Sequence, residues 1–133
     1  MSTTKTFGYN VQTIAAYFKI EPVGPTSSSA RAADPTDYYI DVIGLTSTPV
    51  TVTWVKEENL PMGWTVPICT DAACYAPTIF TQEVTVMTGD TVKFKATFEP
   101  KGTTGPGDIN SFFYVASDSA ATRVEQKLEH QAN

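Results

Sequence analysis

The two cysteines are the residues of this sequence best suited to redox or metal chemistry. Cys69 and Cys74 flank a four-residue loop in the segment CTDAAC. Two thiols this close predict a small-loop disulfide, which stabilises by only about 2 kcal/mol in the chain-entropy model and holds the loop rather than the fold. The alternative is a redox or metal pair. However, the spacing is not CxxC, and a zinc site needs four ligands, usually Cys or His.

Histidine chemistry depends on one residue, His130, three positions from the end of the sequence. A Ser-His-Asp triad needs a rigidly held histidine, and we expect this one to be a solvated tail residue. The sequence lacks the phosphate-binding loop, the GxSxG motif and the HExxH motif. The sequence therefore predicts a protein that is not an enzyme.

Four aspartates lie in predicted loops, where a hard cation finds its oxygen ligands. They are Asp71, Asp90, Asp108 and Asp118, and none shares a DxDxDG-like spacing with another. Aspartates favour turns because their side chains bond to nearby backbone groups. We therefore expect no cofactor and no metal, with a structural calcium ion as the alternative.

Aromatic residues are the candidates for a contact surface. Trp54 alternates with two valines and is expected in the core, whereas Trp64, after a proline and a glycine, either caps the core edge or lies exposed near Tyr75. Phe112 and Phe113 place aromatics on both faces of one strand, although a solvated face should be polar. Either a loop such as 22–35 covers the outer ring or a partner does. The predicted interaction residues are Phe7, Tyr9, Trp64, Tyr75, Phe112 and Phe113.

These side chains must be positioned by strands, because apolar residues recur with period two and are interrupted by Gly, Pro, Asp and Asn. We found no helix-length periodicity. Segment 21–37 has no pattern and is either a surface loop or an extended edge segment, and 101–108 reads as a loop. The predicted strands are 13–20, 38–45, 50–56, 64–68, 78–87, 91–98, 109–117 and 122–129.

Composition supports a β-protein. Hydrophobic residues make up 41% and charged residues 17% of the 133 residues, and 21 residues are threonine, which prefers strands. A net charge of −5 argues against nucleic acid and anionic membrane surfaces, and no apolar run is long enough for membrane insertion. The sequence predicts one domain, 1–133, an all-β antiparallel sandwich of seven to eight strands.

Three segments, read in order, carry a resemblance. They are VTVTW at 50–54 leading into LPMGW at 60–64, CTDAACYAP at 69–77, and TGD at 88–90 followed by FEP at 98–100, the glycines between 102 and 107, and Ile109. This succession resembles immunoglobulin-like or fibronectin-type-III-like sandwich domains of secreted and cell-surface bacterial proteins, and covers about 37–117. The resemblance implies an accessory or structural role. The antibody-type disulfide joins cysteines far apart in sequence, so it does not carry over to this close pair.

These observations predict a structural or interaction protein at an extracellular or cell-surface location, although 1–10 carries no signal peptide. Uncharged threonine faces can be covered by a neighbour at little desolvation cost. The leading expectation is a self-associating subunit or decoration of a filament, surface layer or virion, with 1–10 docking on a neighbour by strand addition. The alternative is an accessory module of a secreted enzyme or adhesin that binds polysaccharide.

Overall fold

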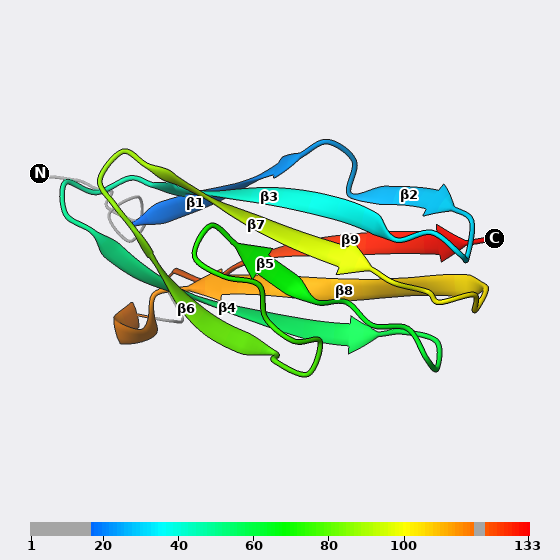
Figure 1. Ribbon diagram of the computed structural model, residues 1–133. Helices are drawn as coiled ribbons and strands as arrows, with labels where there is room; N and C mark the ends of the chain where they lie inside the picture. The colour runs from blue at the N-terminus through cyan, green and yellow to red at the C-terminus, as the bar shows by residue number, and fades with distance from the viewer. Residues whose placement is uncertain (1–16, 119–121) are drawn as a thin grey trace, which may run out of the picture.

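Alternating apolar residues build two β-sheets that pack face to face (Figure 1). The structure is a computed structural model and describes residues 17–118 and 122–133. The first sheet has the order β1-β3-β7-β5, and the second has the order β2-β9-β8-β4-β6. The described strands are β1 (Phe18–Val23), β2 (Ser27–Ala30), β3 (Thr36–Gly44), β4 (Val50–Asn59), β5 (Ile68–Thr70), β6 (Thr81–Val86), β7 (Thr91–Phe98), β8 (Gly105–Tyr114) and β9 (Val124–Ala132).

The predicted all-β sandwich is confirmed, with nine strands in the described residues instead of seven or eight. Most neighbouring strands are antiparallel, but β2 runs parallel to β9. Segment 21–37, which has no sequence pattern, contains this edge strand, so the second of its two interpretations is right. Segment 101–108 is only partly a loop, because β8 begins at Gly105.

The core lies between the two sheets and is formed by the inward positions that the alternation predicts. In β3, β4 and β7 the even-numbered apolar residues are buried, and Trp54 and Phe98 are completely inaccessible to solvent. The aromatic rings meet edge to face, with 5.1 Å between the centroids of Phe94 and Phe113. Such pairs add about 0.5–1.5 kcal/mol to the burial of apolar area.

A short 3₁₀ helix, η2 (Ala116–Asp118), follows β8. Among the residues that the structure describes, no helix is long and apolar enough to cross a membrane.

Candidate interaction surface

Three of the predicted interaction aromatics are buried within the chain itself. Trp64 and Phe113 belong to the core, so neither side chain is open to a partner in the folded chain. Phe112 points to the outer face, but the guanidinium of Arg123 lies 4.2 Å from its ring centroid and leaves 6% of the residue exposed. Within the chain, Arg123 from the segment before β9 thus covers the outer face of Phe112 by a cation–π contact.

Of the three remaining predicted interaction residues, the structure describes only Tyr75. Tyr75 is half-buried and packs against Trp54, with 5.7 Å between the ring centroids. Phe7 and Tyr9 lie outside the described residues. Of the six aromatics, the described ones thus serve mainly to pack the sandwich, because each lies at an inward position or under a neighbouring side chain.

Trp64 lies against His130, which the sequence predicted to be a solvated tail residue. That prediction is wrong: β9 continues to Ala132, and His130 is 2% exposed between Tyr38, Trp64 and Phe98. The Trp64 indole N–H donates to the carbonyl oxygen of Thr103 at 2.8 Å. Pairing of β9 with both β8 and β2 keeps the end of the strand from fraying.

The Tyr38 hydroxyl fixes the protonation of this histidine. It donates to the carbonyl oxygen of Glu129 at 2.8 Å and lies 2.9 Å from Nδ1 of His130. Because its one proton is already donated, Nδ1 of His130 must be the donor in their bond, and Nε2 is the bare nitrogen. Burial lowers the pKa of His130 below its usual 6.5, and burial also raises the pKa of Tyr38. A neutral histidine among aromatic rings is a packing residue.

The cysteine loop is closed as predicted, by a disulfide between Cys69 and Cys74. Backbone bonds run from Thr70 N–H to the Ala73 carbonyl and from Tyr75 N–H to the Ile68 carbonyl, both at 2.8 Å. The loop therefore folds back along the outer edge of β5 and occupies the backbone groups there.

Beside the disulfide is a surface hollow of about 280 Å³, lined partly by Tyr39, Asp71, Lys93 and Lys95. Its charges are of both signs, and Asp71 already accepts the backbone N–H of Lys93 at 3.1 Å. The Tyr39 hydroxyl donates to Asp37 at 3.3 Å. Most of its polar groups thus have partners within the chain, so this hollow offers a ligand little to bind.

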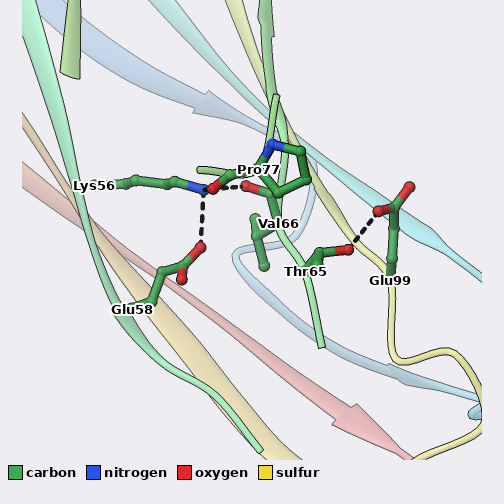
Figure 2. Close-up of polar contacts among 6 residues, drawn as sticks. All are labelled: Lys56, Glu58, Thr65, Val66, Pro77 and Glu99. Atoms are coloured by element: carbon green, nitrogen blue, oxygen red, sulfur yellow. Dashed lines mark hydrogen bonds and ion pairs between the residues drawn. The ribbon is translucent and has the colours of Figure 1, made fainter. Parts of the chain in front are cut away.

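Lys56 is a buried cation that sequence analysis did not single out. It follows Val50, Val52 and Trp54 at the next inward position of β4, and its side chain is inaccessible to solvent. Figure 2 shows its ammonium bonded to the carbonyl oxygens of Val66 and Pro77 and to the Glu58 carboxylate, at 2.6, 2.8 and 2.8 Å. All three ammonium protons are used.

Lys56 also fixes the segment that leads into β6. Its backbone N–H donates to the Phe80 carbonyl at 2.9 Å, and its ammonium lies 4.8 Å from the centroid of the Phe80 ring. The segments before and after the cysteine loop, at Val66 and Pro77, are thus tied to β4 at one point. The residue before β6, Phe80, is thus held against Lys56, although 43% of Phe80 remains exposed.

The backbone bond between Lys56 and Phe80 determines which way the amides of β6 point. Antiparallel strands alternate between hydrogen-bonded and non-hydrogen-bonded pairs. Lys56 and Phe80 stand opposite each other in the register that pairs Trp54 with Gln82. The even-numbered residues of β6 therefore bond to β4. The odd-numbered residues Thr81, Glu83 and Thr85 point their N–H and C=O groups away from the sheet.

The other edge strands carry devices that prevent pairing, and β6 does not. β1 contains Pro22 and the charged pair Lys19–Glu21, β2 has four residues, and β5 has three and is covered by the cysteine loop. Short strands, charges, proline and covering loops are the usual protection of sheet edges. β6 has six residues, one charge and no proline. Within the described part of the chain, no residue other than those of β4 hydrogen-bonds the β6 backbone.

Half-exposed apolar residues flank this open edge. Phe80 is 43% exposed just before β6, and Met87 is 51% exposed just after it. Its outward positions are Thr81, Glu83 and Thr85, so covering the edge desolvates only one charge. The β6 edge, residues 80–87, is the candidate interaction surface. No single-sequence signal identifies it, because which strands lie at an edge depends on pairing across the whole sheet.

Metal ligands do not converge in the described residues. In 17–118 and 122–133, no group of three or more His, Cys, Asp or Glu side chains could hold a metal ion. Of the predicted calcium aspartates, Asp71 bonds to Lys93, and Asp108 accepts the Asn59 amide at 3.4 Å.

Comparison with known proteins supports the fold. No family model matches the sequence, and no curated protein matches it. Among solved structures, the N-terminal domain of PorA superposes with a TM-score of 0.62 at 15% identity, over 80% of this chain and 85% of that one.

Two human proteins give similar superpositions. A chain of the complex between zinc 2-glycoprotein and prolactin inducible protein from human seminal plasma has a TM-score of 0.56 at 12% identity, over 87% of this chain and 93% of that one. The PapD-like domain 7 of human CEP192 has a TM-score of 0.54 at 11% identity, over 100% and 96%. The fold is therefore an immunoglobulin-like sandwich. At 11–15% identity, these similarities indicate the fold and not a function.

Proposed function

We propose that this chain is a non-enzymatic interaction module that associates with copies of itself by strand addition at the β6 edge. The observation that supports this is the open row of N–H and C=O groups at Thr81, Glu83 and Thr85. A strand added there satisfies these groups by main-chain hydrogen bonds, which is the general mode of β-augmentation. The Lys56 contacts hold the edge in place, so little ordering entropy is lost on binding.

The setting that fits this module is an assembly outside the cytoplasm, such as a filament, a surface layer or a virion. A disulfide between Cys69 and Cys74 is typical of oxidising compartments. The low share of charged residues, 17% of the chain, suits a subunit that lies against its neighbours. In this proposal residues 1–10, with Phe7 and Tyr9, remain a candidate for the strand that docks on a neighbour.

The polysaccharide-binding alternative has less support than the sequence suggested. It depends on an exposed Trp64 beside Tyr75, but Trp64 is 6% exposed and its indole N–H is already bonded. A sugar-stacking platform needs an open aromatic face, and this ring lies edge-on to Phe98 inside the sandwich.

Two proline substitutions in β6 test the proposal. Thr85→Pro removes an amide that points away from β4, so it should leave the fold intact and block strand addition. Gln82→Pro removes an amide that bonds to β4 and should cost about 1–3 kcal/mol of unfolding free energy. Light scattering after size exclusion gives the mass of each full-length variant, and thermal unfolding gives its stability.

The wild-type chain should show a mass that rises with concentration. Thr85→Pro should stay monomeric at every concentration and unfold within a few degrees of the wild type. A wild type that is monomeric throughout would overturn the proposal. It would equally be overturned by a folded Thr85→Pro variant that associates like the wild type.

A further inference from the structure

We propose that the strand occupying the β6 edge is β6 of a second copy, in a two-fold antiparallel pair with Val84 opposite Val84 of the second copy. This inference rests on the proposed function and names its partner and register. It joins two five-stranded sheets into one continuous ten-stranded sheet.

Symmetry restricts the register. Two copies that join edge to edge in an antiparallel pair are related by a two-fold axis perpendicular to the sheet, so their core faces lie on the same side. Residues directly opposite each other then point to the same face. Since Val84 and Val86 point inward and Glu83 and Thr85 outward, an even-numbered residue must meet an even-numbered one. This rule allows an axis beside any residue of β6, and the axes nearest the middle of the strand pass beside Glu83, Val84 or Thr85.

Charge and strand length select among these three registers. An axis at Glu83 would place Glu83 opposite Glu83 of the second copy, and like charges directly opposite are destabilising. An axis at Thr85 would set Thr81 opposite Gly89, which lies in the turn after β6. An axis at Val84 sets Glu83 opposite Thr85 of the second copy and extends the pairing only one residue beyond β6, to Met87.

The Val84 register also satisfies the open backbone groups. Glu83 and Thr85 are both outward-bonding positions, so each Glu83–Thr85 pair exchanges two hydrogen bonds, and the two symmetric pairs make four in total. The half-exposed Met87 then lies opposite Thr81 of the second copy, and part of its side chain becomes covered. The pairing uses the same patch on both copies, so it closes at two chains and leaves the other edges free.

Charges at Thr85 test the register, because this side chain is exposed and faces Glu83 of the second copy only in the Val84 register. Thr85→Lys creates two opposite-charge pairs per dimer and should lower the dissociation constant about 3- to 30-fold in sedimentation equilibrium. Thr85→Glu should raise it by a similar factor. The double variant Thr85→Lys/Glu83→Gln should lose the gain.

Thr51 provides matched controls, since it stands opposite Thr85 on β4, is exposed, and lies one strand inside the edge. Thr51→Lys and Thr51→Glu make the same changes in net charge and should alter the dissociation constant less than 2-fold. Equal effects at positions 51 and 85 would overturn the inference, because they would reflect net charge alone. Removal of residues 1–10 should leave the dissociation constant unchanged.

The outcomes separate this inference from the proposed function. If the truncated chain is monomeric and Thr85 charges have no effect, the added strand is the segment 1–10 of a neighbour. The two-fold pair is then wrong while the β6 edge stands. If Thr85→Pro, Thr85→Lys and Thr85→Glu all associate as the wild type does, both the pair and the edge are wrong.

Discussion

Replacing Lys56 by methionine tests whether the buried ammonium holds the cysteine loop and the start of β6. The change keeps most of the side-chain length and removes the donors to the Val66 and Pro77 carbonyls. Hydrogen bonds to a charged group contribute about 1.5–3 kcal/mol each, so the two bonds together amount to about 3–6 kcal/mol. Part of this is offset, because the ammonium no longer has to be desolvated on folding. We expect a net loss of about 3 kcal/mol.

Urea unfolding at equilibrium measures this loss, with Lys127→Met as the control. The Lys127 side chain is 55% exposed and lies 3.6 Å from Glu129, and surface pairs of this kind contribute about 0–1 kcal/mol. Glu58→Gln should cost less than Lys56→Met, because the Glu58 carboxylate is 21% exposed and its replacement leaves the carbonyl bonds in place. A Lys56→Met variant no less stable than Lys127→Met would refute the anchoring role.

Two further predictions concern the aromatic cluster around His130. Burial lowers the folded-state pKa of His130. As the pH falls, His130 is therefore protonated in the unfolded chain at a higher pH than in the folded chain. The unfolding free energy should consequently fall as the pH drops below about 6.5. In His130→Phe, denaturation curves between pH 5 and 7 should lose this slope, and an unchanged slope would assign it to other groups. Gly107→Ala places a Cβ 2.7 Å from Cζ3 of Trp64 and should cost about 1–3 kcal/mol. Trp64→Phe removes that ring carbon, so the Gly107→Ala cost should shrink in the double variant; additive costs would contradict the contact.

The period-two pattern predicted strands and their buried faces well for central strands, which have a neighbouring strand on each side and one face on the core. β7 has the predicted bounds, and the inward positions of β3 and β4 are those that the alternation indicated. Lys56 shares the parity of Val50, Val52 and Trp54, so its inward position could have been read from the sequence. Its carbonyl partners could not, because Val66 and Pro77 approach it only through the folding of the cysteine loop.

The errors have physical causes that are not local. β2 is a run of serines and alanine whose pairing depends on β9, so no alternation marks it. His130 looked like a tail residue because its burial comes from Tyr38, Trp64 and Phe98, all distant in sequence. The aromatics at 112 and 113 suggested a contact surface, and Arg123 supplies the cover within the chain.

Amide hydrogen exchange along β6 at low and high protein concentration tests the β6 edge most directly. The amides of Gln82, Val84 and Val86 bond to β4 and should exchange at similar rates in both conditions. The amides of Glu83 and Thr85 point away from the sheet and should exchange fast when dilute and markedly slower when concentrated. If these outward amides exchange at the same rate at all concentrations while the full chain associates, the β6 edge is not where the copies meet.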